Sequence, residues 1–308
     1  MPIVFSDIDG TLVHYVSHLP DGSVQTENTP VYTSAASSPP KKIPLARLPP
    51  SSTGKVGMVP AELNGAVAAM REETDVKFVI VSGARWKTVR NRADSLPPAD
   101  AYVAEGGGRI FYRNGDGSWR EDAEWRRTHG EGAGEGGADA DLPLRQPLRQ
   151  LAEQLRGLGA TVDDKGYETM FRIPASSPAI EWPTLPDGVS WTTNLGHTDV
   201  CLSTAGKGNA TRFIIERLGG SRESSCCLCD DDNDIVMMRE VDTAFVVQAT
   251  SESVARLCEA AAAAPDGVAD GVRAVLMSEG GPAGTLEAVS RARAWVANSA
   301  SSHVAAAV

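Results

Sequence analysis

The sequence predicts an α/β protein built on a parallel sheet, with a smaller α+β segment inserted into it. Apolar, β-rich runs alternate with helical patterns in the first and last thirds of the chain. Such alternation is typical of a parallel sheet that helices cover on both faces. Polar side chains directly follow several of the runs, at the edge of the sheet where ligands bind. The middle of the chain breaks this rhythm with short strands.

The first predicted strand covers residues 2–6 and ends in two carboxylates, Asp7 and Asp9, followed by Gly10 and Thr11. Beyond the strand, the chain can curl so that both acids lie close to one point. Carboxylates this close repel each other unless a cation lies between them, and Mg²⁺ prefers oxygen ligands. One acid could then attack phosphorus while the other transfers protons.

The rest of the first third alternates helix and strand. We expect helices near 60–72 and 86–94 and strands at 77–82 and 101–104. The strand at 77–82 runs into Ser82-Gly83-Ala84-Arg85, which brings a hydroxyl to the same edge of the sheet as Asp7. Residues 14–60 are rich in Pro, Ser and Thr. We expect this irregular insertion to form an ordered surface excursion or a partial flap.

The middle of the chain predicts a separate α+β unit. Asn114-Gly115 between two short apolar runs signals a hairpin. Leucines at three- and four-residue steps from Leu144 to Leu158 predict an amphipathic helix. Short strands are then expected near 160–163, 167–173, 189–193 and 199–202.

The last third returns to the alternating pattern. Gly206-Lys207-Gly208 precedes an amphipathic helix near 208–218, and a strand at 225–229 runs into the acidic stretch 230–234. Further elements are a helix after Asn233, a strand at 243–247 and helices near 251–263 and 284–298.

Four motifs in this order resemble those of the haloacid-dehalogenase (HAD) superfamily. They are Asp7-Ile8-Asp9-Gly10-Thr11, Ser82, Lys207 and Asp230-Asp231-Asp232-Asn233-Asp234. Cys229 replaces the usual glycine of the fourth motif, and Ala84 separates Gly83 from Arg85. The resemblance implies a HAD-like Rossmannoid parallel-sheet core with a C2-type α+β cap domain, as in the sugar phosphatases of subfamily IIB.

On this reading the core domain is formed by residues 1–106, with the insertion 14–60, and by residues 204–308. Residues 107–203 would form the cap. Because the cap segment lies between Ser82 and Lys207, it leaves and re-enters the core beside the site and can close over it.

The resemblance also implies the roles of the acidic residues. Asp7 would be the nucleophile, and Asp9 the general acid and base. Mg²⁺ would be held by Asp7, the backbone carbonyl of Asp9 and Asp230, with Asn233 or Asp234 completing or supporting the shell.

Three further motif residues would bind the phosphoryl group: Thr11 and Ser82 through their hydroxyls and Lys207 through its charge. Asp231 and Asp232 are ambiguous, because a run of five polar residues contains at least one that only faces solvent.

Substrate specificity is expected to come from the cap and its border. Arg85, Asn194 and His197 are the candidate contacts to the leaving group. The other polar residues on the short cap strands are Glu168, Arg172, Thr193 and Asp199. Sites built around hydroxyl groups discriminate well between substrates.

Composition limits the partners. A net charge of −11 argues against nucleic acid and anionic membranes. The five cysteines are odd in number and unpatterned, which fits a reducing compartment such as the cytoplasm. Cys226, Cys227 and Cys229 lack the partners of a zinc site and are interpreted as small apolar strand residues. A strand beginning at residue 2 leaves no room for a signal peptide, and a targeting segment would have to precede it.

The resemblance implies a Mg²⁺-dependent phosphatase of a hexose or hexitol phosphate, with mannitol 1-phosphate as the single best guess, and we expect a monomer or weak homo-oligomer. Sucrose-phosphate phosphatases and mannitol-1-phosphate phosphatases are the relatives suggested. The alternative, a phosphomutase of the phosphomannomutase type, would need a basic cap pocket, and the cap offers chiefly Arg172. A dehalogenase would leave Asp9 without a proton to transfer. A non-enzymatic sugar-phosphate sensor would not need every chemical group.

Overall fold

The computed structural model describes residues 1–19, 22–25, 30–34, 39–51, 53–129, 143–194 and 196–306 of the chain. Within these ranges, the side chains of His18, residues 22–25, Asn194 and residues 300–306 are not described. In this part of the chain no helix is both long and apolar enough to span a bilayer.

The core is an eight-stranded sheet with the order β15-β14-β13-β1-β6-β7-β8-β9. Six neighbouring strands are parallel. They are β1 (Ile3–Asp7), β6 (Lys77–Val81), β7 (Ala101–Ala104), β13 (Ser225–Cys229), β14 (Thr243–Val246) and β15 (Ala274–Leu276). An antiparallel hairpin of β8 (Arg109–Arg113) and β9 (Trp119–Glu121) closes one edge. β1 therefore lies in the middle of the sheet, flanked by β13 and β6.

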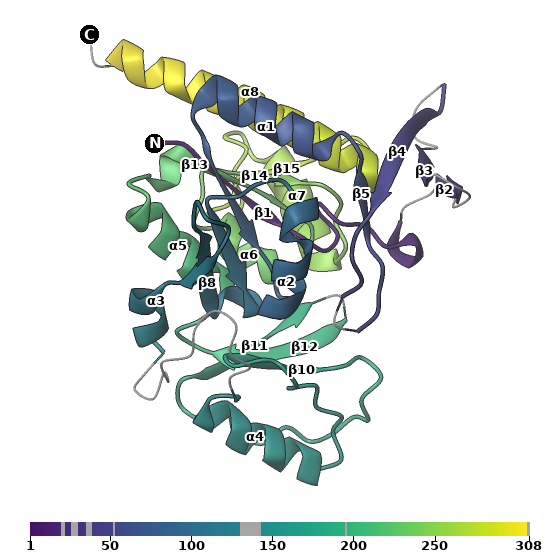
Figure 1. Cartoon of the computed structure of the whole chain (residues 1–308), viewed down its shortest axis with the longest axis vertical. Helices are drawn as coiled ribbons and strands as arrows, with labels where there is room; N and C mark the ends of the chain where they lie inside the picture. Colours follow the sequence, from purple (N-terminus) through teal and green to yellow (C-terminus); the bar gives the residue numbers. More distant parts are fainter. Residues whose placement is uncertain are drawn as a thin grey trace.

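Helices cover both faces of this sheet, as the alternation predicts. One face packs against α1 (Leu63–Thr74), α2 (Trp86–Arg92) and α8 (Gly281–Ala306). The other packs against α3 (Ala123–Arg127), α5 (Lys207–Arg217), α6 (Ile235–Met238) and α7 (Glu252–Ala263). Within β1, Val4 faces the first group while Ile3 and Phe5 face the second, because successive strand residues point to opposite faces. Figure 1 shows α1 and α8 side by side across the end of the molecule away from the cap.

The insertion after β1 is an ordered excursion, as expected, but it forms an antiparallel sheet where the sequence predicts irregular structure. It consists of β2 (Gly22–Gln25), β3 (Val31–Ser34), β4 (Lys41–Arg47) and β5 (Met58–Pro60) in that order. Tyr32, Ile43, Leu45 and Met58 form a small apolar cluster with Ala283 of α8. Its prolines suggest a loop, but strands of this peripheral sheet tolerate proline where its missing N–H is not needed.

The cap consists of a three-stranded antiparallel sheet and one helix. Its strands are β10 (Met170–Ile173), β11 (Val189–Asn194) and β12 (His197–Leu202), in the order β10-β12-β11. Leucines of α4 (Gln146–Gly157) pack against Phe171 and Val200 on one face of this sheet. Figure 1 shows the sheet between α4 and the core, so its other face turns toward the strand ends of the core.

Two sequence expectations about the cap are wrong in detail. The expected start at residue 107 is too early, because β8, β9 and α3 pair with or pack on the core sheet. A hairpin signal predicts a turn but does not say which sheet the hairpin joins. The expected strand near 160–163 is reduced to a single bridge between Asp163 and Arg172.

Two chain segments connect the core and the cap, and they touch. A Cβ at Gly107 would lie 2.2 Å from backbone atoms of Gly206, so only glycine fits there. Next to it, one carboxylate oxygen of Glu105 accepts hydrogen bonds from the backbone N–H groups of Glu168 and Thr169 and from the Thr169 hydroxyl, each at 2.9 Å. These contacts fix where the cap begins relative to the core sheet.

The remaining ordered elements are short. The 3-10 helices are Val16–His18, Ala93–Ser95, Glu105–Gly107, Arg222–Ser224 and Asp232–Asp234. β15 was not expected from the sequence, because its three residues are too few for a clear pattern.

Candidate active site

The candidate site lies at the carboxyl ends of three neighbouring central strands. β1 ends at Asp7, β6 is followed by Ser82, and β13 is followed by Asp230. Because these strands are parallel and adjacent in the order β13-β1-β6, their ends meet at one edge of the sheet. Lys207, the first residue of α5, approaches the same point.

Lys207 is the cation of the site and is only 2% exposed. Its ammonium donates to Asp7 Oδ1 at 2.6 Å, to Asp234 Oδ1 at 2.7 Å and to Asn233 Oδ1 at 3.2 Å. These charge-assisted bonds use all three donors and raise the pKa of Lys207 despite its burial. The lysine is therefore charged and aimed at Asp7.

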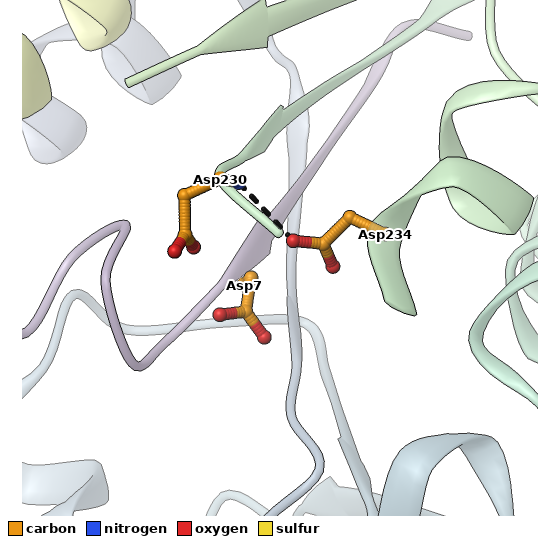
Figure 2. Close-up of side chains that lie close together, drawn as sticks. All are labelled: Asp7, Asp230 and Asp234. Atoms are coloured by element: carbon orange, nitrogen blue, oxygen red, sulfur yellow. Dashed lines mark hydrogen bonds between the residues drawn. The ribbon is translucent and has the colours of Figure 1, made fainter. Parts of the chain in front are cut away.

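Three buried aspartates surround this point. Oxygen atoms of Asp7, Asp230 and Asp234 lie within 4.8 Å of one another. Figure 2 shows the three side chains close together, and a dashed line from the backbone N–H of Asp230 to Asp234. Burial raises the pKa of Asp230, and the charges of Asp7 and Asp234 raise it further. Burial likewise raises the pKa of Asp7, against the opposing charge of Lys207.

The arrangement fits a hard divalent cation. The charge of Asp7 raises the pKa of Asp230, and these two buried carboxylates form an all-oxygen donor set whose repulsion such a cation would remove. Asp234 fits a supporting role better than a ligand role. One of its oxygens accepts from Lys207 and the other from the backbone N–H groups of Asp230 and Asp231.

The turn after β1 holds Asp230 in place. Gly10 has φ +98°, and a Cβ there would lie 2.1 Å from Asp230 Oδ2. The hydroxyl of Thr11 donates to Asp230 Oδ1 at 2.6 Å, and that of Thr250 lies 3.3 Å from Oδ2. The sequence predicts that Thr11 binds the phosphoryl group. In the structure its hydroxyl is hydrogen-bonded to Asp230 of the acidic cluster, and its side chain is fully buried.

Asp9 is held by two residues that sequence reasoning missed. Tyr15 donates from its hydroxyl to Asp9 Oδ1 at 2.7 Å, and Arg92 Nη1 lies 3.2 Å from the same oxygen. Arg92 is 1% exposed and also donates to the Tyr15 hydroxyl at 3.0 Å. Neither residue belongs to a motif, and no spacing along the chain connects them with Asp9.

These residues open into a cavity of about 320 Å³ between the core, the cap and the insertion. Asp7, Asp9 and Ser82 line its inner end, together with Asp231 and Asn233. The cap contributes Asp163, Tyr167, Arg172, Pro174 and His197. The volume lies at the lower end of the range for small-molecule sites.

The candidate substrate contacts differ in their surroundings. His197 lines the cavity, and its Nδ1 accepts the backbone N–H of Ala175 at 3.1 Å. Arg85 also lines it, but its guanidinium is paired with Asp163 and donates to the carbonyl of Lys165 at 2.6 Å. The side chain of Asn194 lies outside the described residues.

The other polar cap residues have partners of their own. Arg172 forms a bidentate ion pair with Asp199, with Nε donating to Oδ1 at 2.6 Å and Nη2 to Oδ2 at 2.7 Å. Glu168 is buried at the connection to the core and pairs with arginines. Asp232 accepts from Thr193 of the cap at 3.0 Å, so it faces the cap and not the acidic cluster.

Comparison with known proteins agrees with this architecture. Residues 184–276, which include Lys207 and Asp230, match the family model described as haloacid dehalogenase-like hydrolase. The sucrose-phosphatase of Synechocystis sp. PCC6803, solved with sucrose and phosphate, has a TM-score of 0.54 at 12% identity, covering 94% of this chain and 97% of that one. A Thermoplasma acidophilum protein has a TM-score of 0.55 at 8% identity, covering 95% and 98%. No curated protein matches the sequence.

A phosphatase of the haloalkanoate enzyme superfamily from Bacteroides thetaiotaomicron has a TM-score of 0.50 at 16% identity, covering 95% of both chains. At these identities the structural likeness concerns the fold. The chain therefore has the fold of the haloacid dehalogenase-like hydrolases. The segment matched by the family model carries Lys207, Asp230, Asn233 and Asp234 of the candidate site.

Proposed function

We propose that the protein is a Mg²⁺-dependent phosphatase that hydrolyses a sugar or polyol monophosphate. The observation that carries the proposal is the position of Asp7. Its buried carboxylate lies at the inner end of a cavity, with the ammonium of Lys207 on one of its oxygens and a second acid, Asp9, on the same cavity wall.

In the proposed reaction, the Asp7 carboxylate attacks the phosphorus atom of the ester. A bond forms between an Asp7 oxygen and phosphorus while the bond from phosphorus to the sugar oxygen breaks. Lys207 offsets the negative charge of the phosphoryl oxygens, and the Ser82 hydroxyl is placed to donate to one of them. Water then cleaves the aspartyl-phosphate and regenerates Asp7.

Asp9 is the proposed general acid and base. Protonated Asp9 donates to the departing sugar oxygen, and the resulting carboxylate then takes a proton from the attacking water. Tyr15 and Arg92 both hold Oδ1, which leaves Oδ2 to exchange the proton. This orientation contributes to catalysis because general acid–base groups act only within hydrogen-bond reach of the reacting atom.

Asp7, Asp230 and the backbone carbonyl of Asp9 are the proposed ligands of Mg²⁺. When bound, the ion would supply positive charge beside the transferring phosphoryl group and remove the repulsion between Asp7 and Asp230. Asn233 and Asp234 support this shell by holding Lys207 and the backbone after β13.

The proposed substrate is a hexose or hexitol phosphate, with mannitol 1-phosphate as the first compound to test. The cavity is small and its walls carry hydroxyl, carboxylate, imidazole and guanidinium groups, which suit a compact polyhydroxyl group. The likeness in fold to a sucrose-phosphatase agrees with this substrate class. A phosphomutase would need several cations for a second phosphate, whereas Arg85, Arg92 and Arg172 are each paired with an aspartate and Lys55 supplies a single charge.

Asp7→Asn tests the proposal. The amide has nearly the same shape but cannot attack phosphorus, so phosphate release from a panel of sugar and polyol phosphates should fall by at least about 10³-fold. The fold should persist, as measured by circular dichroism and thermal unfolding. A variant that kept a tenth of the wild-type rate would rule out Asp7 as the nucleophile. A wild-type protein that releases no phosphate from any ester with Mg²⁺ would refute the proposed function.

A further inference from the structure

The insertion between β1 and α1 contributes a wall to the catalytic cavity. Its strands β4 and β5 are joined by the loop 48–57, and Ser51, Thr53 and Lys55 of this loop line the cavity. In Figure 1 the β4–β5 loop extends from the core toward the edge of the cap sheet. The cavity thus lies between three parts of the molecule, and the cap is only one of them.

The loop contains a hydrogen-bonded turn. The Ser51 N–H donates to the Lys55 carbonyl at 2.9 Å, and the Lys55 N–H donates to the Ser51 hydroxyl at 3.1 Å. At its base, the Leu48 N–H donates to the Gly57 carbonyl at 2.9 Å. These bonds hold the backbone of Ser51 and Lys55 together at the end of the loop.

Arg92 ties this turn to the catalytic centre. Its Nε donates to the carbonyl of Pro49 at 3.3 Å and its Nη2 to the carbonyl of Lys55 at 3.2 Å. The same guanidinium contacts Asp9 and Tyr15 through Nη1. A single buried side chain therefore fixes the distance between the turn and the proposed acid of the reaction.

The tip of the insertion, formed by Ser51, Thr53 and Lys55, differs in its charge pairing from the cap residues that line the same cavity. Lys55 has no carboxylate partner among the described residues, whereas the cap arginine of the cavity, Arg172, is paired with Asp199. His197 lies on the cap side of the same cavity. Its pKa is lowered by burial first and then by Arg172, and the charge of Lys55 contributes in the same direction. Lys55 and His197 thus face a common space from two separate parts of the chain.

We propose that the tip of the insertion is a second surface that recognises the substrate, in addition to the cap. Lys55 and Thr53 bind hydroxyl oxygens at the end of the sugar or polyol that is remote from its phosphate, opposite His197 of the cap. An ammonium can donate to several hydroxyl oxygens, and a threonine hydroxyl can both donate and accept. This inference rests on the proposed function, and it divides specificity between the insertion and the cap.

Two variants test it, each removing a polar group with little change of shape. Lys55→Met keeps the length of the side chain, and Thr53→Val keeps its branching, while the backbone carbonyl that Arg92 uses is untouched. Lys42→Met is the matched control, because Lys42 is an exposed lysine on β4 outside the cavity. The readout is kcat/KM for the best sugar or polyol phosphate of the panel, divided by kcat/KM for p-nitrophenyl phosphate.

We expect this ratio to fall by about tenfold in Lys55→Met and by a smaller factor in Thr53→Val, mainly through KM, and to stay at the wild-type value in Lys42→Met. Calorimetric titration of the same sugar phosphate into Asp7→Asn, with and without Lys55→Met, should show a matching rise in Kd. An unchanged ratio in both tip variants would overturn the inference while leaving the proposed function intact. A wild-type protein that hydrolyses p-nitrophenyl phosphate but no sugar or polyol phosphate would overturn both.

Discussion

At the scale of single residues, the acidic cluster requires that residue 10 has no Cβ atom. The φ of +98° at Gly10 is strained for any residue with a side chain, and a Cβ would lie 2.1 Å from Asp230 Oδ2. Gly10→Ala should therefore push Asp230 away from Asp7. We expect kcat to fall by roughly 10²-fold, because displacements of about 1 Å at a reacting centre have effects of that size. Steady-state kinetics with saturating Mg²⁺ measures it.

Gly65→Ala is the control for Gly10. Gly65 lies in α1, and nothing lies within 4 Å of a Cβ placed there. Alanine has the higher helix propensity, so this variant should be more stable by up to about 1 kcal/mol and equally active. If Gly10→Ala retained full activity, the close approach between the turn and Asp230 would not matter for catalysis.

His14 predicts how stability depends on pH. It is buried, hydrogen-bonded to the Thr285 hydroxyl at 2.7 Å, and burial lowers its pKa to about 3 from 6.5. Below pH 6.5 the unfolded chain binds a proton on this residue while the folded chain does not. The stability that the neutral ring contributes is therefore complete above pH 6.5 and is lost as pH falls from 6.5 toward 3.

Between pH 7 and pH 5, this one residue should cost the fold about 2 kcal/mol, at 1.36 kcal/mol per pH unit below 6.5. His14→Gln cannot titrate, so its free energy of unfolding should fall less than that of the wild type over the same interval. Urea unfolding at several pH values measures the difference. Parallel pH curves for the two proteins would mean that His14 is protonated in the folded state.

At the scale of secondary-structure elements, β12 is expected to carry part of the specificity through His197. Because its Nδ1 accepts the Ala175 N–H, the neutral ring carries its proton on Nε2 and can donate it to a substrate hydroxyl. His197→Ala should raise KM for the preferred sugar phosphate about tenfold, the effect of one hydrogen bond lost from a desolvated partner. The effect on p-nitrophenyl phosphate should be much smaller.

Asp187→Ala is the control for this element, since Asp187 is exposed on the cap and lies outside the cavity. It should behave as wild type on both substrates. Equal losses on both esters in His197→Ala would show that the ring holds the cap together and does not read the sugar.

The elements that the sequence predicted well are those that bury both faces. β1, β6 and β13 are continuous apolar runs ending in polar residues, and their adjacency follows from parallel α/β topology. The sheet of the insertion could not be predicted in the same way. Only a few of its residues face a core, and its prolines suggest a loop. The hairpin of β8 and β9 was recognised, but only tertiary pairing decides that it joins the core.

The same distinction applies to the site. Asp7, Ser82, Lys207 and Asp230 follow strands or open a helix, so their order along the chain predicts where they meet. Tyr15, Arg92 and Lys55 come from the insertion and from the end of α2. These residues reach the cavity only because the insertion folds back on the core. No local sequence pattern predicts that tertiary contact.

At the scale of the whole molecule, Mg²⁺ should stabilise the fold as well as support the reaction. It would bind the folded state alone, because only folding brings Asp7 and Asp230 together. At about 100 times its Kd, Mg²⁺ should raise Tm by about 4 °C. EDTA should abolish both the shift and the activity. Differential scanning calorimetry of the stripped and the loaded protein measures the shift.

Asp230→Asn should lose most of this shift, whereas Glu259→Gln, an exposed substitution on α7, should keep it. A wild-type Tm that does not respond to Mg²⁺, or an Asp230→Asn variant that responds in full, would contradict the proposed ligand set.

The central place of β1 has a consequence for how the protein is made on the ribosome. Asp7 is translated 200 residues before Lys207, so the proposed nucleophile is added to the chain roughly 10–40 s before its cation. During that time β1 lacks β13 on one side, and its apolar face lacks α8. A nascent chain interrupted before α5 therefore lacks Lys207 and exposes apolar surface of β1, which makes it a substrate for chaperones and proteases.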